Sequence, residues 1–244
     1  MRNLLLKIAY CGRNYHGFQI QQNALTVQAV LQNAIWDLVG QKIDIKGCSR
    51  TDTGAHANEY FVSFKTHCDT PCRGFVRALN ALLPADIVAH DCEEKPLDFH
   101  ARYDVKKKEY IYRLLNCECY DPFLEGLVYH YHCSLNYLTL NELAVFFVGT
   151  HSFKATSAKN SGNSDFIRRV YSFNVNKIGD IIQFQVVGNG FLYKMVRIMV
   201  GTLIDFSRSG KTGKDISALI SSEDRQQAGK TVPACGLYLN RVVY

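Results

Sequence analysis

The sequence has no apolar run long enough to cross a membrane. Its longest runs, such as Leu4-Leu5-Leu6 and Met195-Val196, are broken by charges well short of the roughly 18 residues that a spanning helix needs. Arg2 and Lys7 lie near the first residue, but no apolar segment of about 7 to 15 residues follows them as in a secretory signal. A low-complexity tail is also missing. We therefore expect no membrane partner and a cytoplasmic location.

The cysteines lack the pattern of a disulfide scaffold. They number nine, which is odd, and they are too sparse for a small secreted domain. Reduced thiols are the simplest interpretation. The nine are Cys11, Cys48, Cys68, Cys72, Cys92, Cys117, Cys119, Cys133 and Cys235.

An excess of charge is absent from the first hundred residues and present after them. The chain has 244 residues, of which 47% are hydrophobic and 20% charged, so it can bury one large core or two modest ones. The net charge is +6, yet residues 1–100 carry ten basic and ten acidic side chains. A one-sided basic excess favours an anionic partner, because neutralising phosphates releases counterions. Taken alone the signal is weak, since solvated lysine faces are common.

The first half of the chain reads as a βαββαβ unit. Apolar residues alternate in the strands and recur at helical spacing in the helices, and Thr26 and Gly40 are typical caps for the first helix. The order is that of a ferredoxin-like unit. The predicted elements are a strand at 3–10, a helix at 27–38, strands at 43–48 and 58–65, a helix at 72–83 and a strand at 86–93.

The second half repeats this order with an insertion. Thr139 and Glu142 form a capping-box pattern for a helix that Gly149 would end, and Gly179-Asp180 indicates a hairpin. A glycine- and serine-rich stretch, 156–164, is the best candidate for a mobile loop. The other predicted elements are strands at 105–116, 166–177, 181–187 and 237–244 and a helix at 191–206.

These patterns predict an α+β protein of two ferredoxin-like (βαββαβ) subdomains, with mixed, mainly antiparallel sheets flanking a central basic cleft. We expect an N-terminal domain at 1–100 and a C-terminal domain with a basic RNA-binding surface at 101–244. The last strand can return to the N-terminal half.

The predicted loop between the strands at 43–48 and 58–65 holds reactive side chains. Arg50, Asp52 and His56 supply a cation, an acid and a base within seven residues. A structural explanation is available, because Asp forms Asx turns and loop arginines often pair with it. The functional alternative is that a nearby arginine keeps Asp52 ionised, so that its carboxylate serves as a nucleophile or a base.

The run SRTDTGAH at 49–56 resembles the catalytic signature of the TruA family of tRNA pseudouridine synthases. Three further segments agree in the same order: YCGRNYHGFQ at 10–19, FHAR at 99–102 with YIYR at 110–113, and FLYKMVR at 191–197. This sequence departs from the family at Ser49, where bacterial members commonly have glycine, and at Tyr193-Lys194, where they have a histidine pair. The aspartate and both arginines are intact.

The resemblance implies that Asp52 attacks the target nucleotide at C1′ or at C6 of uracil. It implies that Arg50 takes part in flipping the base, that Tyr110 stacks on the base, and that Arg197 pairs with the catalytic carboxylate. The expected reaction converts uridine to pseudouridine at positions 38 to 40 of the tRNA anticodon stem-loop, with no cofactor and no metal. Members usually act as homodimers in which one tRNA touches both subunits.

The residues alone leave alternatives for these roles. Tyr110 shares a strand face with Tyr112, so it can simply be a sheet residue. Arg197 has apolar neighbours on its helix, so its charge needs a partner or a cleft. A basic cluster, Arg102, Lys106, Lys107, Lys108 and Arg113, with Tyr103 and Tyr110 between, is typical of a phosphate-contacting ridge, or of an edge strand that lysines protect from aggregation.

Two alternatives of other classes remain. Two thiolates and two imidazoles can close a zinc tetrahedron, and such residues occur at Cys117, Cys119, His130, His132 and Cys133. The Cys-x-Cys spacing is unusual for zinc, however, and the resemblance implies no metal. A noncatalytic tRNA-binding protein or chaperone that has kept the fold is the alternative to the enzyme.

Overall fold

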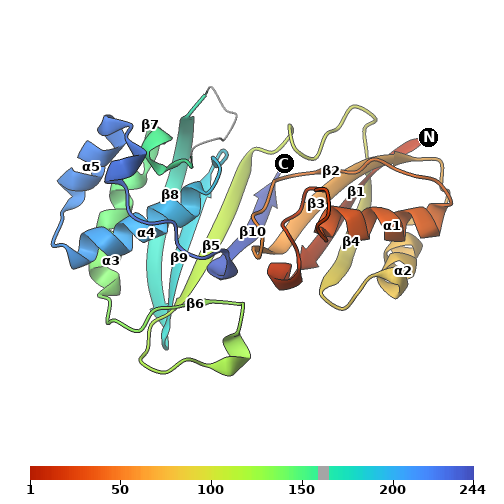
Figure 1. Cartoon of the computed structure of the whole chain (residues 1–244). Coiled ribbons are helices and arrows are strands. Elements are labelled where there is room, and N and C mark those ends of the chain that lie inside the picture. The colour runs from red at the N-terminus through yellow and green to blue at the C-terminus, as the bar shows by residue number, and fades with distance from the viewer. Residues whose placement is uncertain (159–164) are drawn as a thin grey trace. The chain divides into compact units, whose positions relative to one another are not determined.

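The computed structural model describes residues 1–158 and 165–244 of the chain, which form two compact units (Figure 1). Unit 1 comprises residues 1–106 and 238–244, and unit 2 comprises residues 107–237. The division thus follows Lys106, whereas the sequence analysis placed it at residue 100. Most of the loop predicted at 156–164 lies outside the described residues. Within those residues, none of the helices is long and apolar enough to cross a membrane.

Unit 1 has the predicted βαββαβ order. Its strands lie in the order β4-β1-β3, with β2 paired to β3 and all of these pairs antiparallel, while β10 pairs with β3 in parallel. The two helices contact each other, and α2 packs on β4. The elements are β1 (Arg2–Tyr10), α1 (Val27–Val39), β2 (Lys46–Gly47), β3 (His56–Thr66), α2 (Cys72–Leu82), β4 (Ile87–Lys95) and β10 (Leu237–Val243).

The caps predicted for α1 are confirmed. The Thr26 hydroxyl accepts a hydrogen bond from the Ala29 N–H at 3.3 Å, and Gly40 ends the helix in the left-handed conformation, with φ of 74°. On the apolar stripe of α1, Leu31 and Ile35 are fully buried, and Val30 and Leu38 are half-buried. The periodicity and both caps therefore agree with the fold.

The strand predicted at 43–48 is reduced to the two residues of β2. Ile43 and Ile45 are buried as the alternation implied, but they have no strand pairing. Their carbonyls instead accept hydrogen bonds from side chains of α1, Gln32 Nε2 to Ile43 at 2.9 Å and Gln28 Nε2 to Ile45 at 3.4 Å. Side-chain amides of α1 thus supply the hydrogen bonds for backbone carbonyls that the alternating pattern had assigned to a sheet.

Unit 2 is built on an antiparallel sheet in the order β5-β9-β8-β7, with β6 paired to β5 in parallel. On one side of this sheet α3 contacts α4 and α5 (Figure 1). The predicted hairpin between β8 and β9 is confirmed. The elements are β5 (Lys107–Leu115), β6 (Tyr129–His130), α3 (Tyr137–Ala144), β7 (Gly149–Ser152), β8 (Ile167–Ile178), β9 (Ile181–Gly188), α4 (Met195–Arg208) and α5 (Gly213–Ser222). The chain is thus α+β with mixed, mainly antiparallel sheets, as predicted.

The predicted ends of α3 are wrong. Asn136 caps the helix, because its side-chain oxygen accepts from the N–H groups of Leu138 and Thr139 at 3.0 and 3.5 Å. The helix ends at Ala144 and continues as a 3-10 turn, while Gly149 lies in β7. Asn is as good an N-cap as Thr, so the earlier residue starts the helix.

Two other helices of unit 2 differ from the prediction. The helix predicted from residue 191 begins at Met195, because Lys194 adopts the left-handed conformation with φ of 59° and interrupts the helical backbone. The helix α5 was not among the predicted elements. Its first turn has a capping box formed by Thr212 and Asp215, a motif that the sequence pattern had indicated at Thr139 and Glu142 instead.

Candidate active-site loop and basic residues

The loop at 48–55 joins β2 to β3 and is held by hydrogen bonds from both sides. At its start, the Cys48 N–H donates to the Phe61 carbonyl at 2.9 Å, and the Tyr60 hydroxyl donates to the Ser49 carbonyl. In its middle, the hydroxyls of Tyr10 and Thr51 are hydrogen-bonded with 2.8 Å between their oxygens. These bonds come from β1 and β3, so the sheet of unit 1 fixes the position of the loop.

Two glycines of the segment at 10–19 let this segment lie directly against the loop. A Cβ on Gly12 would lie 1.8 Å from the Ala55 carbonyl oxygen. Gly17 has φ of +82°, and a Cβ there would lie 2.5 Å from the Thr51 carbonyl oxygen. The Gly54 N–H donates to the Tyr15 carbonyl at 3.1 Å. Two motifs far apart in the sequence are therefore parts of one structure.

His56, which the sequence offered as a base, is buried with 1% of its surface exposed. Its Nδ1 accepts a hydrogen bond from the Gly12 N–H at 3.0 Å, so this nitrogen carries no proton. The ring stacks on Tyr238 of β10, with centroids 4.5 Å apart. We interpret His56 as a residue that joins the loop to the 10–19 segment rather than as a base.

Asp86, the residue before β4, holds the 10–19 segment through hydrogen bonds to Tyr15 and Cys11. The Tyr15 hydroxyl donates to Asp86 Oδ1 at 2.6 Å, and the Asp86 carbonyl accepts from the Cys11 N–H at 2.9 Å. Burial and the Asp86 carboxylate raise the pKa of the Tyr15 hydroxyl above its ordinary value. Tyr15 therefore stays protonated and keeps donating at physiological pH.

Asp52 opens a tight turn at the exposed end of the loop. The Asp52 carbonyl accepts from the Ala55 N–H at 3.0 Å, and Gly54 has φ of +79°, which this turn position requires. Asp52 is half-buried, and Arg50 is exposed. A carboxylate on such a fixed backbone can attack an electrophilic carbon without first ordering a flexible segment.

Tyr110 and Arg197 belong to unit 2. Tyr110 lies in β5 opposite Val186, is 6% exposed, and meets the Phe191 ring edge to face at 5.0 Å between centroids. Arg197 is half-buried on α4, and its Nε donates to the Val232 carbonyl at 2.8 Å. That carbonyl supplies the polar partner that a charge on an apolar helix needs.

The predicted basic residues are divided between the two units. Arg102 and Lys106, in unit 1, are exposed, and the Arg102 guanidinium lies 5.8 Å from the Tyr103 ring centroid. Lys107 and Lys108 open β5 of unit 2, where Lys107 is exposed and Lys108 half-buried. The Lys107 ammonium lies 5.0 Å from the centroid of Tyr171, a residue that the sequence analysis did not single out.

Two of the five residues of the zinc alternative form side-chain hydrogen bonds to backbone carbonyls. The Cys117 thiol donates to the Cys119 carbonyl at 2.8 Å, and His130 Nε2 is bonded to the Cys117 carbonyl at 2.9 Å. Across residues 1–158 and 165–244, no group of three or more His, Cys, Asp or Glu side chains is arranged to hold a metal ion. The zinc alternative therefore has no geometric support in the described residues.

Comparison with known proteins gives consistent matches over the chain. A family described as tRNA pseudouridine synthase matches residues 7–104 and 143–244. Proteins named tRNA pseudouridine synthase A are similar over the full length of both chains. Those of Thermoanaerobacter sp. (strain X514), Clostridium acetobutylicum and Acetivibrio thermocellus are 41%, 42% and 41% identical over 245, 247 and 244 residues.

Proposed function

This chain belongs to the tRNA pseudouridine synthase family, and we propose that it isomerises uridines at positions 38 to 40 of the anticodon stem-loop, with Asp52 as the nucleophile. Synthesis of pseudouridine in tRNA, an isomerisation, is the family's activity. The observation that carries the choice of Asp52 is its place in a turn that hydrogen bonds from β1 and β3 hold at the end of the sheet.

The proposed reaction is balanced without a cofactor. The bond between C1′ and N1 of uridine breaks, the uracil rotates, and C5 bonds to C1′. The C5 hydrogen then leaves to water as a proton, and N1 takes up a proton from water. Asp52 assists by adding to C1′ or to C6 and is released at the end. Moving the nucleotide out of the stem costs a few kcal/mol, so side chains must support the flipped base. We assign this support to Arg50 and Tyr110.

The remaining proposed roles concern charge and assembly. Arg102, Lys106, Lys107 and Lys108 contact phosphates, and so contribute affinity rather than sequence choice. We propose that the protein acts as a homodimer, which sedimentation equilibrium would test through the mass in solution. The cytoplasm is the proposed location, because the substrate is tRNA.

Mapping of the modified positions tests the proposed target. We expect the wild-type protein to form pseudouridine in transcripts that carry uridine at position 38, 39 or 40, detected by chemical mapping of each position. A matched transcript with cytidine at all three positions should remain unmodified. Pseudouridine in that control transcript would show that the target is elsewhere in tRNA. The same conclusion would follow if the uridine-containing transcripts were modified only outside positions 38 to 40.

Arg197→Ala is expected to lower the rate of pseudouridine formation by roughly a hundredfold, because it removes the cation proposed to hold the catalytic carboxylate ionised. The slope of tRNA affinity against salt should change little, since no phosphate contact is lost. The variant also loses the Nε bond to Val232. Arg197→Lys is the matched control, because it loses the same bond and keeps the charge. Equal activity of the two variants would refute an electrostatic role.

A further inference from the structure

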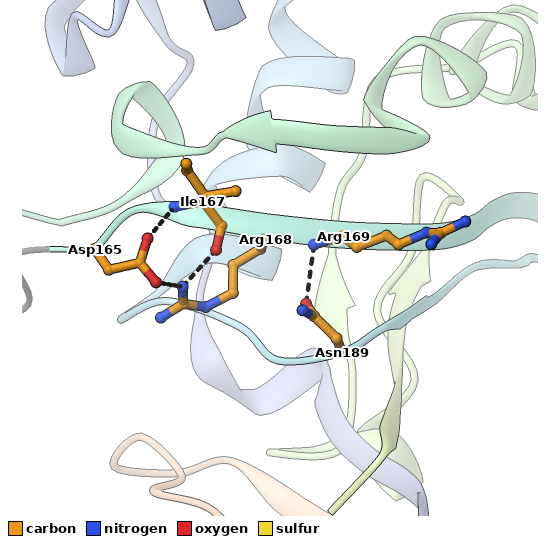
Figure 2. A network of polar contacts seen from close by, with 5 residues as sticks. All are labelled: Asp165, Ile167, Arg168, Arg169 and Asn189. Carbon is orange, nitrogen blue, oxygen red and sulfur yellow. Dashed lines mark hydrogen bonds and ion pairs between the residues drawn. The ribbon is translucent and has the colours of Figure 1, made fainter.

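At the start of β8, two neighbouring arginines are held by different contacts (Figure 2). The Arg168 guanidinium forms an ion pair, since its Nη1 donates to Asp165 Oδ2 at 3.3 Å. The same nitrogen donates to the Ile167 carbonyl at 2.5 Å. The side chain of Arg169 extends along β8 and away from Asp165. Within the described residues, Arg169 forms no ion pair.

The backbone of Arg169 is fixed, although its guanidinium has no ion-pair partner in the part of the chain that the structure describes. The Asn189 side-chain oxygen accepts from the Arg169 N–H at 2.9 Å (Figure 2). The Asn189 N–H in turn donates to the Arg169 carbonyl at 3.0 Å. Both backbone groups are thus satisfied by one residue that follows β9. An arginine on such a support loses little backbone freedom when it binds a ligand.

A second cation meets the same aromatic ring as Arg169. Val170 lies opposite Gly188 and Ser172 opposite Val187, so Tyr171 is the extra residue of a β-bulge, a feature that redirects side chains. Tyr171 is 37% exposed. The Arg169 guanidinium carbon lies 5.4 Å from its centroid, and the Lys107 ammonium of β5 lies 5.0 Å from it.

Two positive charges beside one exposed ring repel each other, and an anion between or beside them relieves that repulsion. Lys107, like Arg169, has no ion pair among the described residues. The planar guanidinium, the ammonium and the tyrosine hydroxyl can all donate hydrogen bonds to phosphate oxygens. Their exposed position on a sheet suits an extended polyanion better than a small enclosed ligand.

We propose that Arg169, Lys107 and Tyr171 form a binding site for the phosphodiester backbone of RNA. The site adds Arg169 and Tyr171 to the proposed phosphate contacts and gives Lys107 two defined neighbours. It rests on the proposed function for the identity of the RNA, which is tRNA. Because the site binds backbone and not bases, it contributes affinity without selecting sequence.

Arg169→Ala tests this site through tRNA binding by the full chain. The dissociation constant should rise about five- to tenfold at moderate salt, and the slope of log affinity against log salt should fall by about one. The turnover number at saturating tRNA should not change. Arg168→Ala is the matched control, because Asp165 already neutralises that neighbour, and it should stay within about twofold of wild type. Arg169→Lys should restore the salt slope.

The outcomes separate this site from the proposed function. Wild-type affinity and slope for Arg169→Ala would overturn the site, and so would an equal loss in Arg168→Ala, since any nearby charge would then suffice. If pseudouridine forms at positions 38 to 40 while Arg169→Ala binds normally, the site fails and the function stands. If Arg169→Ala weakens tRNA binding but wild type modifies other positions, the site stands and the proposed target fails.

Discussion

Asp52→Asn is expected to lower pseudouridine formation by at least about a thousandfold while leaving the affinity for tRNA within about twofold of wild type. The amide has nearly the volume of the carboxylate but cannot act as the nucleophile. The hydrogen bond from the Ala55 N–H to the Asp52 carbonyl uses the backbone of residue 52, so it remains in the variant. Chemistry and binding should therefore separate at this one residue.

The measurement pairs single-turnover rates with dissociation constants at several salt concentrations. Asp44→Asn is the control, because Asp44 is an exposed carboxylate of the same unit that pairs with Lys46. It should keep wild-type rates and affinity. Normal pseudouridine formation by Asp52→Asn would mean that the nucleophile is another residue.

Gly12→Ala is expected to reduce activity by about a hundredfold or more, although residue 12 carries no reactive group. Its new Cβ would lie 1.8 Å from the Ala55 carbonyl oxygen, a distance that real atoms do not tolerate, so the loop must move. A displacement of about 1 Å can cost a hundredfold in rate. The overpacking should also lower the free energy of unfolding by about 1 to 3 kcal/mol.

Gly40→Ala provides the matched comparison for this variant. Gly40 has φ of +74° and open space around it, so alanine there brings strain without a clash. We expect a loss of about 1 kcal/mol in the free energy of unfolding and no loss of activity. Denaturant unfolding and single-turnover rates measure the two effects. Full activity of Gly12→Ala would show that the close approach does not position the loop.

Local patterns in the sequence predicted the elements whose signals are local. The first helix lies between Thr26 and Gly40 as expected, and the turn at Gly179 closes the predicted hairpin. Errors arose where one local signal competed with another. Asn136 and Thr139 are both good caps, and only the fold decides between them. No apolar pattern reveals that Lys194 turns left-handed and delays the start of α4.

The sequence places the candidate site residues in motifs, but it does not show which segments lie together. The resemblance pointed to Asp52 because the motif is contiguous, and it pointed to the 10–19 segment as a further segment that agrees with the family. It did not reveal that Gly12 touches Ala55 or that His56 accepts a hydrogen bond from Gly12, because these contacts join distant parts of the chain. Arg169 was missed because its environment depends on a bulge and on Asn189.

Release of tritium from C5 of uridine tests the central claim most directly. The wild-type protein, without added metal or nucleotide, is incubated with tRNA transcripts labelled at C5, and tritium is counted in the water. Because C5 forms the new bond to C1′, we predict release from transcripts with uridine at positions 38 to 40 and none from a matched transcript with cytidine there. Absence of release from every tRNA would contradict the account and leave a noncatalytic tRNA-binding protein or chaperone.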